Sequence, residues 1–321
     1  MSRALRIVFM GTPSFAVASL RALVESGHEV VAAVTQPDQP AGRGRDVQPP
    51  AVKEFALGRG IAVEQPPKLR DPAVERRLRE LAPEAIVVAA YGKILPKALL
   101  ELPPHGAINV HASLLPKYRG AAPIQRAILA GEKRTGVTIM KMNERMDEGD
   151  ILLAKEVAIR DDDTTESLQS TMAEVGTALL VETLDRLVRG DLTPRRQRDE
   201  DASLAPMVRR EEGLIDWRRP AAEIERATRA FQPWPSAYTH VGGKLLKIHR
   251  AAVTAGDDGA APGTVSVASG DDLEIATGEG RLRLLEVQLE GKRRLGAREF
   301  LAGRTVRAGD RLGVYAHPAL C

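Results

Sequence analysis

The chain has 321 residues, which at roughly 150 residues per domain predicts about two domains. Its composition, with 43% hydrophobic and 28% charged residues, is typical of a folded globular protein and excludes a disordered chain. The net charge of +3 is too small by itself to indicate a nucleic-acid partner. The only cysteine is Cys321, so an intramolecular disulfide and a cysteine metal cluster are excluded.

No segment approaches the roughly 18 consecutive apolar residues of a membrane span, and residues 1–6 lead directly into a strand-like run without a signal peptide. We therefore expect a cytoplasmic protein with no membrane contact. The six histidines show no pair at metal-ligand spacing, so we expect no metal.

Short β-branched runs alternate with longer amphipathic segments in the first half of the chain. We expect strands at residues 5–10, 29–35, 85–90, 107–111, 136–142 and 151–159, and helices at 14–26, 71–81, 121–130 and 164–188. Residues 5–10 and 85–90 are continuously hydrophobic, as parallel strands buried on both faces are. The pattern predicts an α/β domain over residues 1–189, with a Rossmann-like doubly wound sheet that binds ligands at the carboxyl ends of its strands.

A polar, charge-dense stretch follows at residues 190–209, and we interpret it as a linker. Residues 210–321 begin with one expected helix at 220–231. Expected strands then follow at 244–253, 264–268, 273–276, 281–289 and 311–316, separated by Gly, Asp and Pro turns. This spacing predicts a small β-barrel or sandwich.

The first turn of the expected sheet, Gly11-Thr12-Pro13, stands where a dinucleotide-binding chain carries GxGxxG. That fingerprint is absent, which argues against a nicotinamide or flavin cofactor. No GxxxxGK[ST] loop is present either, so nucleoside triphosphate hydrolysis has no support.

The most informative segment is residues 107–113, where Asn109 and His111 alternate with apolar residues. In a strand the two polar side chains point to the same face. A hydrogen-bonded core pair is the structural alternative. However, residues 113–124 contain two prolines and a glycine before the next helix, which indicates an irregular loop at the carboxyl edge of the sheet. Functional residues concentrate in such loops.

A second cluster, residues 143–150, is rich in carboxylates and lies between two expected strands. Taken alone it reads as a solvated hairpin loop. Combined with His111, it offers acid and base groups, because the carboxylate of Asp147 would orient and stabilise an imidazole.

Basic residues accumulate in two other places. Residues 36–50 form an expected Pro/Gly loop that carries Arg43 and Arg45, with Lys53 just beyond. Loops longer than roughly 12 residues are usually functional or disordered, and we interpret this one as an anion-contacting loop. Arg209 and Arg210 belong to basic clusters of the linker and second domain that are compatible with phosphate contacts. Because aromatic residues make up only 3%, contacts to a nucleic-acid backbone are favoured over base stacking.

A set of motifs extends along nearly the whole chain. They are Gly11-Thr-Pro-x-Phe15, Gln36-Pro-Asp38, Pro40-Ala-Gly-Arg-Gly44, Ala90-Tyr-Gly92, Asn109-Val-His-x-Ser-Leu-Leu-Pro116, Arg119-Gly-Ala-Ala-Pro-Ile124, Thr135-Gly-Val-Thr-Ile139, Asp147-x-Gly-Asp-Ile151, Ile215-Asp-Trp217 and Arg229-Ala-Phe-x-Pro-Trp-Pro235. Together they resemble the folate-dependent formyltransferases, and among these the methionyl-tRNA formyltransferase family. The Phe-x-Pro-Trp-Pro segment and the second domain separate the chain from the related glycinamide ribonucleotide enzymes. One departure is Ala112, where many relatives have Gly.

The resemblance implies the roles of the candidate residues. It implies that Asn109, His111 and Asp147 are catalytic, and that Arg43 reaches the acceptor end of a tRNA. The residues implied to line the 10-formyltetrahydrofolate site are Ser113, Leu114, Leu115 and Pro116. Their charge makes Arg45, Lys53, Arg209 and Arg210 further candidates for tRNA contacts.

The resemblance also implies a reaction and a second-domain fold. The second domain would be an OB-like, tRNA-binding β-barrel. The implied activity is the transfer of a formyl group from 10-formyltetrahydrofolate to the α-amino group of methionyl-initiator tRNA, for the initiation of protein synthesis, by a monomer without a metal. Two alternatives stay open: a formyltransferase that acts on an amino-sugar nucleotide, and a non-catalytic tRNA-binding protein.

Overall fold

The computed structural model describes residues 3–41, 46–256, 259–303 and 306–313. These divide into two compact units, which we call unit 1 and unit 2. Unit 1 comprises Met1–Pro123, Arg134–Ala158 and Gln169–Pro206, and unit 2 comprises Ile124–Lys133, Ile159–Leu168 and Met207–Cys321. Two stretches that we expected in the first domain, 124–133 and 159–168, therefore pack with the second.

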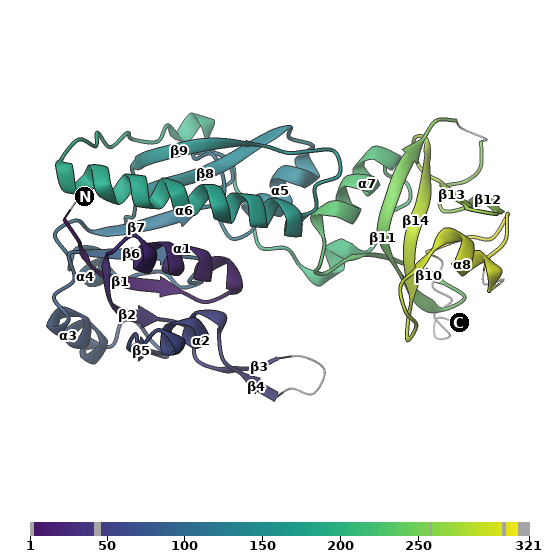
Figure 1. Ribbon diagram of the computed structural model, residues 1–321. Coiled ribbons are helices and arrows are strands. Elements are labelled where there is room, and N and C mark those ends of the chain that lie inside the picture. Colours follow the sequence, from purple (N-terminus) through teal and green to yellow (C-terminus); the bar gives the residue numbers. More distant parts are fainter. Residues whose placement is uncertain (1–2, 42–45, 257–258, 304–305, 314–321) are drawn as a thin grey trace. The chain divides into compact units, whose positions relative to one another are not determined.

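Unit 1 is built on a seven-stranded sheet in the order β5-β2-β1-β6-β7-β8-β9 (Figure 1). Its strands are β1 (Arg6–Gly11), β2 (Glu29–Val34), β5 (Val63–Glu64), β6 (Ala85–Ala89), β7 (Ala107–His111), β8 (Arg134–Lys141) and β9 (Ile151–Ala158). The pairs from β5 to β7 are parallel, whereas β7, β8 and β9 pair antiparallel. The predicted Rossmann-like sheet is confirmed, with an antiparallel edge that the apolar runs did not reveal.

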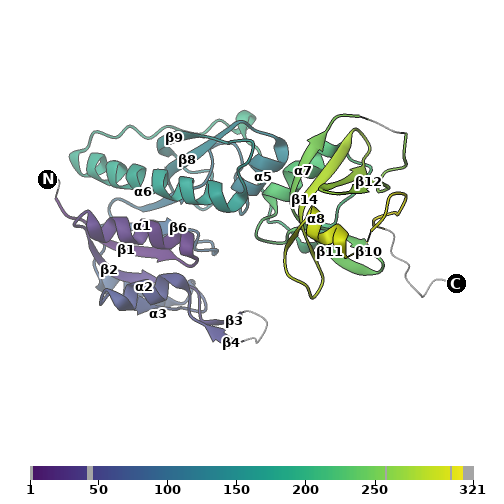
Figure 2. The same ribbon diagram turned by 45° about the vertical axis from the view of Figure 1, so that its right-hand side comes forward.

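The helices of unit 1 are α1 (Ser14–Glu25), α2 (Ala51–Gly58), α3 (Pro72–Glu80), α4 (Lys97–Leu100) and α6 (Thr165–Arg189), whose first turn belongs to unit 2. Helices α1 and α6 lie side by side in both ribbon views (Figures 1 and 2). A Cβ built on Gly176 of α6 lies 3.3 Å from a methyl carbon of Val110 in β7 and from one of Val137 in β8. Helix α6 therefore covers the face of β7 to which Val110 points.

The expected loop at residues 36–50 has structure of its own at its ends. Strands β3 (Gln39–Ala41) and β4 (Asp46–Gln48) pair antiparallel as a short hairpin, and α2 begins directly afterwards. The prediction of a loop over the whole of residues 36–50 was therefore wrong at residues 39–41 and 46–48. The apolar period-two pattern that marks most strands is too short to detect in strands of three residues.

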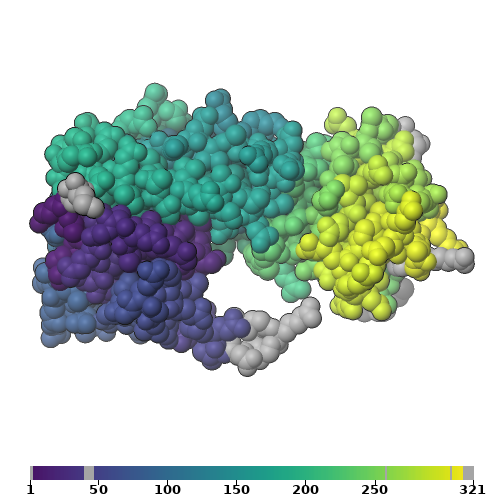
Figure 3. Space-filling view, in the orientation of Figure 1, coloured from purple at the N-terminus to yellow at the C-terminus, as the bar shows by residue number. Residues whose placement is uncertain are grey.

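Unit 2 is an antiparallel sheet in the order β10-β11-β14-β13-β12, and β15 pairs with β14. Its elements are β10 (Ala237–Val241), β11 (Lys244–Thr254), β12 (Val265–Ser269), β13 (Asp272–Ala276), β14 (Arg281–Leu289), β15 (Leu295–Gly296), α5 (Pro123–Ala130), α7 (Ala221–Ala230), α8 (Ala297–Ala302) and the 3-10 turn η2 (Arg210–Gly213). A further 3-10 turn, η1 (Asp199–Asp201), belongs to unit 1. The inward side chains of the sheet form one apolar core with Trp217 and Phe300. Strand β14 and helix α8 appear together as the yellow surface of this unit (Figure 3). The prediction of a small β domain in the second part of the chain is thus confirmed, and its sheet is antiparallel.

Two predicted details of unit 2 differ from the structure. Strand β10 was missed, because Ala237–Val241 contains the polar residues Thr239 and His240, whose burial the sequence does not reveal. Of the strand expected at 311–316, Arg311 forms an isolated bridge with Thr264, and residues 314–316 lie outside the described part of the chain.

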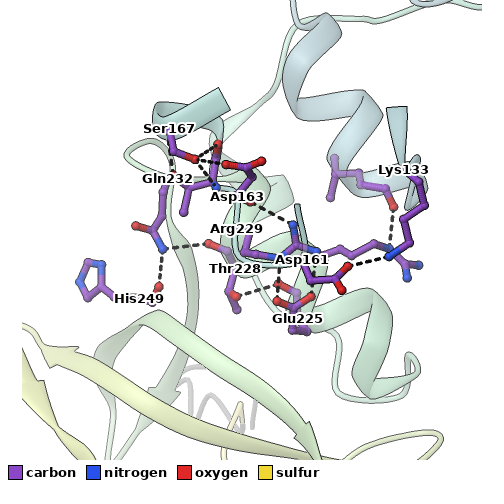
Figure 4. Close-up of polar contacts among 12 residues, drawn as sticks. Lys133, Asp161, Asp163, Ser167, Glu225, Thr228, Arg229, Gln232 and His249 are labelled. Atoms are coloured by element: carbon purple, nitrogen blue, oxygen red, sulfur yellow. Dashed lines mark hydrogen bonds and ion pairs between the residues drawn. The ribbon is translucent and has the colours of Figure 1, made fainter. Parts of the chain in front are cut away.

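Helix α7 is fixed within unit 2 by polar contacts on its Arg229 side (Figure 4). The guanidinium of Arg229 donates to both carboxylate oxygens of Glu225, at 2.7 and 3.1 Å, and to the backbone carbonyl of Asp163 at 3.0 Å. The hydroxyl of Thr165 donates to the carbonyl of Ala230 at 2.6 Å. These contacts satisfy carbonyls at the end of α7 and around Asp163, which gives Arg229 of the Arg-Ala-Phe motif a structural role.

We predict that His28, which lies between α1 and β2, makes unit 1 sensitive to acid. Its side chain is buried, its Nδ1 accepts a hydrogen bond from the backbone N–H of Leu5, and burial lowers its pKa, partly offset by Asp185. Below about pH 6.5, the ordinary pKa of histidine, the unfolded chain binds a proton at His28 that the folded chain does not. The contribution of His28 to folding stability is therefore fully present above about pH 6.5. It is lost as the pH falls from there through the lower pKa that His28 has in the folded chain.

Thermal melts from pH 7.5 to pH 5 test this prediction. The melting temperature of His28→Gln should fall less over this range than that of the wild type, and the difference between the two should be constant above pH 7. Equal slopes in the two proteins would contradict it.

Candidate active site

Three side chains predicted to act together lie side by side in unit 1. The side-chain amide of Asn109 donates to Asp147 Oδ1 at 3.4 Å, and His111 Nδ1 lies 3.7 Å from Asp147 Oδ2. Asn109 and His111 come from β7, and Asp147 comes from the loop between β8 and β9. The residues Asn109 and His111 are 8% and 6% exposed and the Asp147 side chain is 14% exposed, so the cluster is largely shielded from water while its edge stays accessible.

The alternation of β7 explains why the first two groups meet. Val110 faces α6, so Asn109 and His111 on either side of it point to the opposite face of the sheet. His111 is the last residue of β7, at the carboxyl edge where ligands bind in doubly wound sheets.

The loop after β8 turns sharply to bring its carboxylate back to β7. Asp147 has a φ of +53°, in the left-handed region that non-glycine residues seldom adopt. Gly149 allows the turn to close, because a Cβ there would lie 1.8 Å from the carbonyl oxygen of Lys141. The Asp-x-Gly-Asp motif therefore has a steric cause. The backbone N–H of Gly120 completes the site by donating to Asp147 Oδ2 at 2.9 Å.

A hydrogen bond of His111 indicates which of its ring nitrogens carries a hydrogen. Its Nε2 lies 3.0 Å from the backbone carbonyl of Tyr118. A carbonyl oxygen only accepts hydrogen bonds, so we infer that Nε2 carries a hydrogen. The other ring nitrogen, Nδ1, faces Asp147.

The segment predicted to line the donor site has buried and accessible members. Ser113 is fully buried and its hydroxyl donates to the carbonyl of Lys117 at 2.6 Å, while Leu115 is 5% exposed. Leu114 and Pro116 are partly exposed. Atoms of Leu114 and Pro116 are therefore the ones available for contact with a ligand, and Ser113 and Leu115 support the loop.

The predicted tRNA contacts are in three different situations. Arg43 and Arg45 lie outside the described residues. The ammonium of Lys53 is 2.6 Å from a carboxylate oxygen of Asp38, whose other oxygen accepts from the amide of Gln65 at 2.7 Å. These hydrogen bonds, first that of Gln65 and then that of Lys53, lower the pKa of Asp38. Lys53 therefore joins α2 to the base of the β3–β4 hairpin.

Arg209 and Arg210 belong to unit 2 and are both exposed. They stand at the start of η2, where the backbone N–H of Arg209 donates to Glu212 at 2.7 Å. Glu212 also pairs with Arg126 at 2.6 Å, and this hydrogen bond is the main cause of its lowered pKa.

Sequence reasoning missed several groups that shape the site. They are the carbonyl of Tyr118, the N–H of Gly120, and the buried side chains of Arg119 and Gln197. Backbone groups leave no sequence signal. Arg119 did leave a signal in the sequence, because it begins the motif Arg119-Gly-Ala-Ala-Pro-Ile124. Gln197 had none, because it lies in the charged stretch that we interpreted as a linker.

Among the described residues, no group of three or more His, Cys, Asp or Glu side chains is arranged to hold a metal ion. None of the helices in the described ranges combines the length and apolar character needed to cross a bilayer.

Two protein-family models match the chain. The model described as "Formyl transferase" matches residues 5–184, and the model described as "Formyl transferase, C-terminal domain" matches residues 207–305. Together with the Rossmann-like sheet and the clustered trio, these matches define the class of protein as a formyl transferase.

Curated relatives narrow this class. The chain is 52% identical over 305 residues to a methionyl-tRNA formyltransferase of Myxococcus xanthus, covering 95% of this chain and 97% of that protein. It is 50% identical to that of Citrifermentans bemidjiense, with 96% of each chain covered. The chain belongs to the methionyl-tRNA formyltransferase family.

Solved structures agree on the fold. HypX from Aquifex aeolicus in complex with tetrahydrofolic acid has a TM-score of 0.63 at 19% identity, over 93% of this chain and 47% of that chain. An N-formyltransferase from Helicobacter canadensis in complex with folinic acid and dTDP-3-aminofucose has a TM-score of 0.65 at 18% identity, over 87% and 98%.

The steric role of Gly149 gives a testable prediction. In Gly149→Ala the added methyl group must displace the Asp147 loop from the Lys141 carbonyl, so we expect formyl transfer to fall about 100-fold, the effect of roughly a 1 Å misplacement.

Turnover and circular dichroism of Gly149→Ala are compared with those of Gly58→Ala. Gly58 ends α2 and has nothing within 4 Å of a built Cβ, so this control should keep its activity. Wild-type turnover in Gly149→Ala would show that the loop position does not matter.

Proposed function

We propose that the chain transfers the formyl group of 10-formyltetrahydrofolate to the α-amino group of methionyl-initiator tRNA, with Asn109, His111 and Asp147 as the catalytic residues. The observation that carries this proposal is the meeting of these three side chains in a member of the methionyl-tRNA formyltransferase family. The tetrahydrofolic acid bound to the A. aeolicus neighbour supports a folate-type donor. In this role we expect a cytoplasmic monomer.

The reaction requires hydrogen-bond donors where negative charge develops. Attack of the amine on the formyl carbon forms a C–N bond and converts the formyl oxygen into an oxyanion. The side-chain amide of Asn109 and a protonated Nδ1 of His111 flank the same accessible edge and supply such donors. Preorganised donors of this kind stabilise the transition state because they need no reorganisation during the reaction.

The reaction also requires that a proton be moved. An α-amino group has a pKa of about 7.7 to 8.0, so much of it is protonated near neutrality and must lose a proton before it attacks. In our proposal the Nδ1 of His111 takes that proton and Asp147 stabilises the resulting imidazolium. The tetrahedral intermediate then loses its second amine proton, the bond from carbon to folate N10 breaks, and N10 gains a proton. The products are the formylated amine and tetrahydrofolate.

In this proposal the folate donor and the tRNA contact different parts of the chain. Leu114 and Pro116 contact the folate donor, and Ser113 and Leu115 keep their loop in place. Arg43, Arg45 and Lys53, together with Arg209 and Arg210 of unit 2, contact tRNA phosphates. The unit 2 sheet, an OB-like barrel in this reading, binds the tRNA through its backbone.

Two other functions are distinguishable from this one. A formyltransferase for an amino-sugar nucleotide shares the fold, as the H. canadensis structure shows, but at 18% identity that likeness concerns the fold alone. A non-catalytic tRNA-binding protein has no need of the trio. Release of tetrahydrofolate in the presence of methionyl-tRNA separates both from the proposed enzyme.

We predict that Asn109→Ala lowers turnover about 100- to 1,000-fold, as removal of one oxyanion donor does, with little change in tRNA affinity. Steady-state kinetics and filter binding measure the two quantities. A turnover close to the wild-type value would remove Asn109 from the mechanism.

We predict that the protein prefers the initiator tRNA and that its binding of tRNA weakens with salt. The wild-type protein should formylate methionyl-initiator tRNA faster than methionyl-elongator tRNA, and binding should weaken as salt rises because phosphate contacts release counterions. Equal rates on both tRNAs, or formylation of an amino-sugar nucleotide instead, would contradict the proposed substrate.

A further inference from the structure

Gln197 is buried beside the site although it lies in a stretch of charged residues. It follows α6 along the chain, and only 6% of its surface is exposed, whereas Arg196 and Arg198 on either side are exposed. A glutamine amide has two N–H donors and one carbonyl acceptor, and burial without partners would be costly. All of these groups have partners in the structure.

The N–H groups of Gln197 hold the loop that carries Asp147. Its Nε2 donates to the backbone carbonyl of Asp147 at 2.8 Å and to that of Gly149 at 2.7 Å. Both carbonyls belong to the turn in which Asp147 adopts its positive φ. Such a conformation is strained and persists only where the surroundings enforce it. One side chain therefore fixes both sides of the strained turn.

The carbonyl group of Gln197 joins this loop to a second one. Its Oε1 accepts from Arg119 Nε at 3.0 Å, and the same guanidinium donates to Asp199 at 3.0 Å. Arg119 is 6% exposed. The residues on either side of Arg119 contact the trio through their backbone atoms. The carbonyl of Tyr118 accepts from His111, and the N–H of Gly120 donates to Asp147.

We propose that Gln197 is a positioning residue, which sets the place of the Asp147 carboxylate relative to His111 by bridging the Asp147 turn and Arg119. Gln197 touches neither reacting group and acts through Asp147. The expected effects on kinetics rest on the proposed function. The hydrogen bonds of Gln197 do not depend on that function. The stretch after α6 is thereby part of the active site and more than a connection between units.

The variant Gln197→Met keeps the length of the side chain and removes all three hydrogen bonds. We expect kcat to fall about 10- to 100-fold, since a displacement of roughly 1 Å in a catalytic group costs up to about 100-fold. The KM for 10-formyltetrahydrofolate should stay within about twofold. Gln169→Met is the matched control, because Gln169 is a partly exposed glutamine of α6 outside this network, and it should keep wild-type kinetics.

A double-mutant cycle separates positioning from a general loss of stability. If Gln197 acts through Asp147, Gln197→Met should add less than about threefold to the loss caused by Asp147→Asn, because contacting residues that act as a unit are not additive. A purely structural role predicts that the two losses multiply. Full multiplication, or a kcat within twofold of the wild type in folded Gln197→Met, would overturn the proposal.

A crystal structure of Gln197→Met gives a readout independent of activity, so failure of the proposed function is distinguishable from failure of this inference. We expect the bond from Gly120 N–H to Asp147 Oδ2 to be lost and the distance from Asp147 Oδ2 to His111 Nδ1 to exceed 3.7 Å. An unchanged trio in that structure would overturn the positioning role, whatever the wild-type enzyme formylates. If the variant does not crystallise, the cycle decides.

Discussion

The arrangement of the site depends on one carboxylate, that of Asp147, and on the groups that hold it. Its Oδ2 accepts from the N–H of Gly120 and lies near His111, and its Oδ1 accepts from Asn109. A partly buried carboxylate with hydrogen-bond donors on both oxygens is confined to one place. Asn109 and His111 are thereby held beside the same carboxylate.

The contributing segments are distant in sequence and meet because of the order of the sheet. Strand β7 pairs parallel with β6 and antiparallel with β8, so the loop after β8 starts beside Ala107 at the amino end of β7 and turns back to reach Asn109 and His111. Helix α6 occupies the opposite face and leaves the Asn109 face for chemistry. The chain after α6 then passes the site again, where Ala205 and Arg119 form a backbone hydrogen bond at 2.7 Å. The chain thus encloses its site within unit 1.

Sequence patterns predicted the parts of this arrangement that follow from local periodicity. The bounds of β7 were predicted to the residue, and the shared face of Asn109 and His111 followed from strand alternation. The partner of His111 was inferred from charge and resemblance. The role of Gln197 was not predicted, because a long-range hydrogen bond leaves no periodic pattern in the sequence. The charged residues beside Gln197 suggested a solvated stretch. Strands β3 and β4 escaped because three residues are too few to show alternation. The contact of Lys53 with Asp38 depends on a turn whose path the sequence does not specify.

A crystal structure of this protein with 5-formyltetrahydrofolate, a stable analogue of the donor, would test whether the trio surrounds the formyl group. We expect the formyl oxygen to lie within hydrogen-bond distance, about 2.7 to 3.2 Å, of Asn109 Nδ2 or His111 Nδ1. A bound folate whose one-carbon group lies away from all three side chains would contradict it.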